Sequence, residues 1–166
     1  HPAIASYSDF IAEKLSTVPT TGIAGKISLP SSLFPHRSAL TAWALRRGRA
    51  AMFAGTGLGK SLMELAWAQA VYATTGKDIL HLAPLAVSAQ MAREADKFGI
   101  PARIVARQSD CGDGINITNY QKLDHFDLSQ FGGVILDESS ILKSTDGHYR
   151  TKLIEVCQAI PFRLAA

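Results

Sequence analysis

Two spacings of apolar residues alternate along the chain. Short apolar runs predict buried strands, and stretches with apolar residues three and four positions apart predict helices that pack on them. The predicted strands comprise residues 50–54, 78–82, 102–106, 115–118, 133–136 and 162–165. The predicted helices comprise residues 38–47, 61–75, 86–97 and 152–159. This alternation is typical of an α/β fold with a mostly parallel sheet and helices on both faces, which binds ligands at the carboxyl ends of its strands.

The first 33 residues differ from this pattern and predict an N-terminal extension. Ser8 is a suitable N-cap for a short helix with Phe10, Ile11 and Leu15 on one face. Prolines and glycines then break the pattern into a loop. Residues 34–166 follow as one α/β domain, and Gly48 is expected to end its first helix.

Composition narrows the class of protein. A chain of 166 residues that is 47% hydrophobic suits one folded domain and excludes extensive disorder. Two cysteines are too few for a disulfide framework, and the five histidines show no metal-ligand spacing, so we expect a reducing, cytoplasmic location and no zinc site. No apolar stretch reaches the roughly 18 residues of a membrane span. A net charge of +3 permits a nucleic-acid partner without indicating one.

The most informative segment joins the strand at 50–54 to the helix at 61–75, and reads Ala54-Gly55-Thr56-Gly57-Leu58-Gly59-Lys60-Ser61. A glycine-rich loop between a strand and a helix is the context of a phosphate-binding loop. Backbone N–H groups of residues 55–59 would face the phosphates at the positive end of the helix. Lys60 would reach the β- and γ-phosphates, and the Ser61 hydroxyl would ligate Mg²⁺. The segment therefore predicts that ATP binds with Mg²⁺.

An acidic pair follows the strand at 133–136. Asp137 and Glu138 should lie at the same edge of a parallel sheet as the phosphate loop. Asp137 could then hold the Mg²⁺ that Ser61 also contacts. Glu138 could orient and deprotonate the water that attacks the γ-phosphate. Lys60, Asp137 and Glu138 are thus the predicted catalytic residues.

Together these segments resemble the motifs of superfamily 2 helicases. Residues 54–61 resemble motif I, usually A-x-x-G-x-G-K-[ST], and Asp137-Glu138-Ser139-Ser140 resembles motif II, the DEAD/DEAH position. Leu82-Ala83-Pro84-Leu85 resembles motif Ia. Ile117-Thr118-Asn119-Tyr120 resembles a segment of Swi/Snf-type ATPases. Over about residues 8–166, the combination is most similar to Swi/Snf-like DEAD-box helicases of phages and prophages.

The resemblance implies the first RecA-like lobe of a P-loop NTPase that hydrolyses ATP and acts on nucleic acid, with double-stranded DNA as the expected partner. It assigns Pro84, Leu85, Thr118 and Asn119 to the nucleic-acid face. Contacts there would be to phosphates and would not specify sequence. We expect residues 34–166 to be this lobe, stopping near motif III, with the second lobe and its arginine finger absent. ATP hydrolysis by such a fragment should be slow.

Arg37 departs from the family pattern. It stands where these helicases carry a glutamine that reads adenine, and an arginine side chain has no hydrogen-bond acceptor. Adenine selectivity is therefore open, and Arg37 could instead stack on the base. Two other functions also remain open. The chain could be a small P-loop kinase, or a nucleic-acid-binding module with a vestigial phosphate loop.

Two further sets of residues are expected to be structural. Trp43 and Trp67 lie within predicted helices and should pack in the core. Arg46, Arg47 and Arg49 should form a solvated turn between the first helix and the first strand.

Overall fold

The fold is seen in a computed structural model that describes residues 21–51, 58–137, 151, 158 and 160–165. The short helix expected after Ser8 lies outside the described residues. The helix expected over residues 152–159 also does, apart from residue 158.

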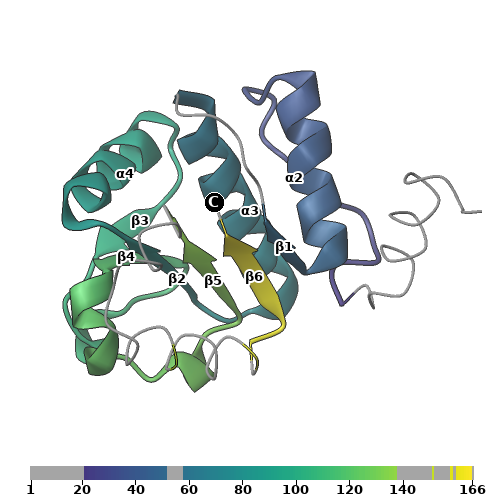
Figure 1. Cartoon of the computed structure of the whole chain (residues 1–166). Coiled ribbons are helices and arrows are strands. Elements are labelled where there is room, and N and C mark those ends of the chain that lie inside the picture. The colour runs from purple at the N-terminus through teal and green to yellow at the C-terminus, as the bar shows by residue number, and fades with distance from the viewer. Residues whose placement is uncertain (1–20, 52–57, 138–150, 152–157, 159, 166) are drawn as a thin grey trace, which may run out of the picture.

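Six parallel strands form one sheet in the order β1-β6-β5-β2-β4-β3 (Figure 1). The strands are β1 (Arg49–Ala51), β2 (Ile79–Ala83), β3 (Ala102–Ile104), β4 (Ile115–Asn119), β5 (Gly133–Leu136) and β6 (Phe162–Ala165). All six predicted strands are present, and β5 and β6 have the predicted bounds. The α/β fold with a parallel sheet is therefore confirmed.

Two apolar clusters cover opposite faces of this sheet because side chains alternate along each strand. Ile79 of β2 and Ile135 of β5 pack in the cluster formed with helices α2 (Pro35–Arg47), α3 (Leu58–Thr75) and α4 (Leu85–Lys97). Leu80 and Val134 belong to the second cluster, with the 3-10 helices η2 (Tyr120–His125) and η3 (Leu128–Gln130). A further 3-10 helix in the described part of the chain is η1 (Gln108–Asp110). The three 3-10 helices are too short to show a periodicity in the sequence.

Helix α2 differs from the prediction at its start. It begins at Pro35, three residues earlier than expected, because proline is well suited to the first turn of a helix. It ends as predicted at Gly48, which has a φ of 78° and donates its N–H to the carbonyl of Ala44.

Residues 21–33 lie against α2. The Ile23 N–H donates to the Leu45 carbonyl at 2.9 Å, and the side chains of Ile23 and Leu33 are buried in the core. The Arg46 guanidinium donates to the carbonyls of Ile23, Ala24 and Gly25 at 3.2, 3.3 and 3.2 Å. The prediction of a merely solvated turn was therefore wrong for Arg46, which fastens this segment to the helix.

The two tryptophans differ in environment. Trp67 is fully buried, as predicted, and meets the Phe162 ring edge-on at 6.5 Å between centroids. The prediction was wrong for Trp43, which is 45% exposed. It lies off the helix face that buries Thr41, Ala44 and Leu45, and Arg47 lies over its ring at 5.8 Å. None of the helices within the described part of the chain is long and apolar enough to cross a membrane.

Candidate nucleotide site

Lys60 and Asp137 meet at the edge of the sheet. Lys60 lies in the first turn of α3, and Asp137 directly follows β5. The Lys60 ammonium forms an ion pair with Asp137 Oδ1 at 2.9 Å. The Lys60 side chain is 20% exposed and that of Asp137 is 4% exposed, so solvent screens this pair only weakly. Two predicted site residues, distant in sequence, therefore touch in the folded chain.

Both backbone polar groups of Asp137, the N–H and the carbonyl, are hydrogen-bonded. Its N–H donates to the Leu82 carbonyl at 2.8 Å, which extends the pairing of β5 with β2 by one residue. The Tyr120 hydroxyl donates to the Asp137 carbonyl at 2.7 Å. These bonds fix the position from which the carboxylate reaches towards α3.

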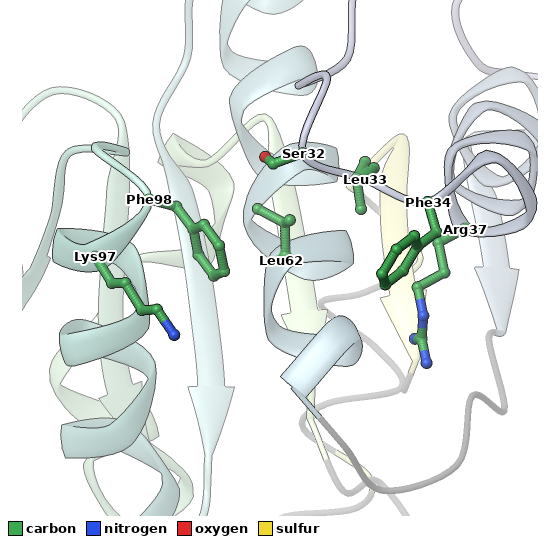
Figure 2. A pocket seen from close by; sticks show the side chains of 7 residues that line it. All are labelled: Ser32, Leu33, Phe34, Arg37, Leu62, Lys97 and Phe98. Carbon is green, nitrogen blue, oxygen red and sulfur yellow. The ribbon is translucent and has the colours of Figure 1, made fainter.

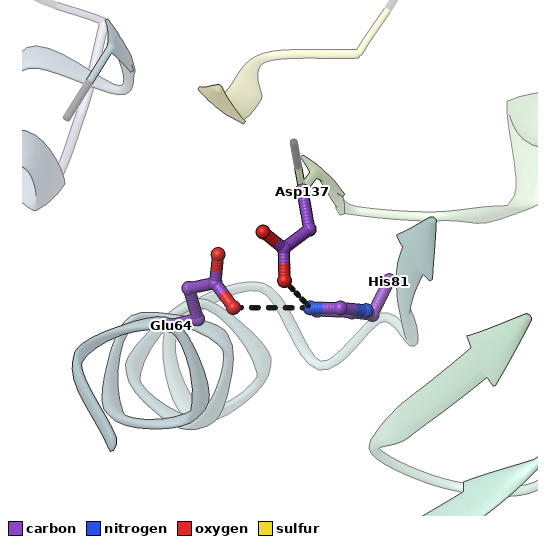
Figure 3. Close-up of side chains that lie close together, drawn as sticks. All are labelled: Glu64, His81 and Asp137. Carbon is purple, nitrogen blue, oxygen red and sulfur yellow. Dashed lines mark hydrogen bonds and ion pairs between the residues drawn. The ribbon is translucent and has the colours of Figure 1, made fainter. Parts of the chain in front are cut away.

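Two further buried groups, Glu64 and His81, complete a cluster with Asp137 (Figure 3). His81 Nε2 lies 3.2 Å from Glu64 Oε2 and 3.5 Å from Asp137 Oδ2. Glu64 and His81 are both 0% exposed. Each of the three residues offers one possible metal-ligand atom, and these atoms lie within 4.8 Å of one another. The three side chains come from α3, β2 and the end of β5.

Burial and mutual contacts shift the pKa values of Glu64, His81 and Asp137 in different directions. Burial raises the pKa of Glu64, and this outweighs the opposing effect of His81. Burial acts to lower the pKa of His81, but hydrogen bonds to Asp137 and Glu64 prevail and raise it to about 9. Burial acts to raise the pKa of Asp137, but His81 and then Lys60 hold it well below its usual range. Asp137 is therefore ionised at neutral pH, beside the Lys60 ammonium and the His81 ring.

Glu64 and His81 were missed as site residues by the sequence analysis. Glu64 stands four positions after Lys60, which places both on one face of a helix. His81 interrupts an otherwise apolar strand next to β5. A polar residue inside a buried strand was the signal that could have indicated it.

Only some of the other predicted site residues lie in the described part of the chain. Ser61 is partly buried in the first turn of α3, and the backbone of Leu58 and Gly59 begins that helix. Gly55, Thr56, Gly57 and Glu138 lie outside the described residues.

Arg37 lines a small cleft beside the start of α3 (Figure 2). The cleft measures about 210 Å³ and is lined by Ser32, Leu33, Phe34, Arg37, Leu62, Lys97 and Phe98. Phe34 is 67% exposed, and Arg37 Nη1 donates to Met63 Sδ at 3.4 Å. This volume is below the usual range for a drug-sized ligand, so it suits a single ring system rather than a whole nucleotide. Leu62 directly follows Ser61, so the cleft adjoins the predicted phosphate site.

The predicted nucleic-acid residues gather at a second cleft. It measures about 260 Å³ and includes Leu85, Thr118, Asn119 and Lys122 in its lining. Leu85 is 65% exposed. Within the described part of the chain, Thr118 Oγ1 and Asn119 Oδ1 have no hydrogen-bond partner. Pro84 is the N-cap of α4 and lies at the carboxyl end of β2, next to this cleft's Leu85.

Comparison with solved structures identifies the fold. The UvsW helicase of bacteriophage T4 matches 96% of this chain with a TM-score of 0.65 and 18% identity, over 59% of its own length. The Sulfolobus solfataricus SWI2/SNF2 ATPase core, solved with double-stranded DNA, matches 85% of the chain with a TM-score of 0.64 and 17% identity, over 34% of its length. The fold is RecA-like.

This RecA-like chain thus spans 59% and 34% of the length of those two neighbours. A hypothetical ATP-dependent RNA helicase from Sulfolobus tokodaii is also similar, with a TM-score of 0.50 and 15% identity over 78% of this chain and 44% of its own. No protein-family model matches the sequence. No curated protein matches it either.

Proposed function

We propose that this chain is the ATP-binding RecA-like domain of a nucleic-acid-dependent ATPase. The observation that carries the proposal is the ion pair between Lys60 and Asp137, because it joins the end of the predicted phosphate loop to the predicted metal ligand. A hydroxyl and a carboxylate are oxygen ligands of the kind that Mg²⁺ prefers, so Ser61 and Asp137 fit that ion. An Mg²⁺ ion held by these residues would supply positive charge to offset that of the phosphates.

The side chains then have separate tasks. Lys60 exchanges Asp137 for phosphate oxygens when the nucleotide binds. The backbone N–H groups at the start of α3 face the phosphates, where the helix dipole favours negative charge. Glu138 orients the attacking water and accepts its proton. In a longer protein, a second RecA-like lobe would supply an arginine, which in related phosphoryl-transfer systems is worth about 10³–10⁵ in rate.

The cleft at Phe34 and Arg37 is the proposed site of the base. Its aromatic and aliphatic lining suits a planar ring, and its charged groups, Arg37 and Lys97, are donors. Guanine presents two adjacent acceptors to an arginine, whereas the same edge of adenine presents one acceptor and one donor. We therefore propose that base selectivity here is relaxed towards guanine.

The cleft at Leu85, Thr118 and Lys122 is the proposed nucleic-acid face. Lys122 supplies a positive charge beside the exposed Leu85, whereas the Thr118 hydroxyl is buried and would reach a phosphate oxygen only if the cleft opened. Such contacts position a strand without reading its sequence, and their strength should fall as salt rises.

Fluorescence anisotropy of a labelled DNA duplex over a range of salt concentrations tests this function. The parent should bind the duplex, and Lys122→Ala should reduce the dependence of affinity on salt by about one unit of slope. Lys77→Ala, which removes an exposed lysine next to the end of α3, is the matched control and should change the slope less. A chain that does not bind duplex at low salt contradicts the nucleic-acid assignment. Phosphate transfer to a small acceptor, unaffected by DNA, would favour a kinase.

A further inference from the structure

His81 is a polar residue at the centre of the sheet. Its register partners are Ile135 on β5 and Ile117 on β4, and the residues beside it in β2 are Leu80 and Leu82. An imidazole in such surroundings is costly unless its polar atoms have partners. The partners of Nε2 are Glu64 and Asp137, which approach from α3 and from the end of β5 (Figure 3). His81 therefore connects the helix of the phosphate loop to the predicted metal ligand.

The carboxylate of Asp137 is held from two unequal sides. Lys60 contacts Oδ1 at 2.9 Å and is 20% exposed. His81 contacts Oδ2 at 3.5 Å, and its side chain is 1% exposed. Lys60 is a flexible side chain near solvent and can exchange its partner. His81 is a short, buried ring in a central strand and has little room to move away from Asp137.

Glu64 is the second carboxylate in contact with the His81 ring. Its Oε2 lies 3.2 Å from the same Nε2 atom that faces Asp137. Glu64 lies on α3, four residues after Lys60, so the His81 ring contacts the same helix that carries Lys60. Nε2 therefore faces both carboxylates, while Nδ1 has no hydrogen-bond partner within the described part of the chain.

We propose that His81 is a positioning residue for the metal site: it holds Asp137 Oδ2 when Lys60 turns to the phosphates, so that the carboxylate stays in the place from which it would hold Mg²⁺. This inference rests on the proposed function, because that function moves Lys60 to the phosphates. Without His81 the carboxylate would keep only its hydrogen bond to Glu64 once Lys60 has turned to the phosphates. Removing a hydrogen-bond partner of a ligating group typically costs 10–100-fold in metal affinity.

The test is the dependence of ATP affinity on free Mg²⁺, measured by calorimetric titration of ATP into the whole chain, with an EDTA arm for metal-free binding. His81→Leu removes the donor, and His81→Gln keeps an N–H that can reach a carboxylate. Ile117→Val is the matched control, since Ile117 is equally buried and is the register partner of His81 on β4. Circular dichroism confirms that each variant is folded. If His81→Leu does not fold, Glu64→Leu is used in its place, because it removes the carboxylate that contacts Nε2 of His81.

We expect His81→Leu to raise the free Mg²⁺ needed for half-maximal enhancement of ATP affinity by about 10–100-fold. Metal-free ATP affinity should stay near that of the parent. His81→Gln should recover most of the Mg²⁺ response, Ile117→Val should retain it, and Glu64→Leu should shift it in the same direction as His81→Leu.

Two results would overturn the inference alone. One is an unchanged Mg²⁺ response in folded His81→Leu or Glu64→Leu. The other is an equal loss of ATP affinity with and without Mg²⁺, which is what a purely structural role would give. A parent chain whose ATP affinity does not respond to Mg²⁺ would instead contradict the proposed function itself.

Discussion

Lys60→Ala should destabilise the nucleotide-free chain, because it removes the ammonium 2.9 Å from the buried Asp137 carboxylate. Breaking a buried pair and leaving a bare charge costs about 3–5 kcal/mol, and losing a hydrogen bond to a charged group costs about 1.5–3 kcal/mol. His81 remains beside Asp137 in the variant, so the lower range applies and we expect about 2 kcal/mol. For a chain of this size that corresponds to a fall of roughly 4–8 °C in Tm.

Thermal and urea unfolding of the parent, Lys60→Ala, Asp137→Asn and the double variant form a cycle that isolates the pair. The double variant should be more stable than the sum of the single losses predicts, by about 1–2 kcal/mol. Lys77→Ala is the control and should stay within about 0.5 kcal/mol of the parent, since Lys77 is exposed. A Lys60→Ala chain that melts at or above the parent's temperature, or a cycle that is strictly additive, would refute this reasoning.

Three other predictions concern single residues. Gly48→Ala should lose about 1–3 kcal/mol in urea unfolding, because its φ is 78° and a Cβ would lie 2.9 Å from the backbone nitrogen of Gly22. Gly76→Ala, with a φ of 68° and open space around it, should lose less, and equal losses would count against the contact. Arg37→Gln should raise the preference for ATP over GTP in competition binding; an unchanged ratio would remove Arg37 from the base site. The pKa of His81 is raised from 6.5 to about 9, so its stabilisation is complete below pH 6.5 and is lost as the pH rises through about 9. The free energy of unfolding of the parent should therefore fall more steeply over that interval than that of His81→Leu, and parallel profiles would contradict this assignment.

The contact between Lys60 and Asp137 could be anticipated because it depends only on topology. The start of α3 and the residue after β5 both lie at the carboxyl edge of a parallel sheet, whatever the packing between them. The apolar run that defines β5 likewise predicted its bounds, since a strand buried on both faces admits few polar residues. In β6 buried and partly buried positions alternate, and Arg163 occupies a partly buried one. The strand bounds follow from the local pattern of apolar residues. The meeting of Lys60 with Asp137 follows from the general rules for the order and right-handed connection of parallel strands.

The cluster of Glu64, His81 and Asp137 could not be anticipated in the same way. It depends on which face α3 turns towards β2, and that rotation is decided by packing of side chains that lie far apart in the sequence. The environments of Arg46 and Trp43 could not be predicted from the sequence for the same reason. Arg46 finds its carbonyl partners only because residues 21–33 fold back onto α2. Trp43 is left outside because Thr41, Ala44 and Leu45 define the buried face.

Calorimetric titration of Mg²⁺-ATP into the parent, Lys60→Ala and Lys77→Ala shows whether this chain binds ATP through Lys60. We expect saturable binding by the parent and by Lys77→Ala, and a loss of at least tenfold in affinity, about 1.4 kcal/mol, in Lys60→Ala. Equal affinity in the parent and Lys60→Ala, or no binding by the parent, would contradict the account.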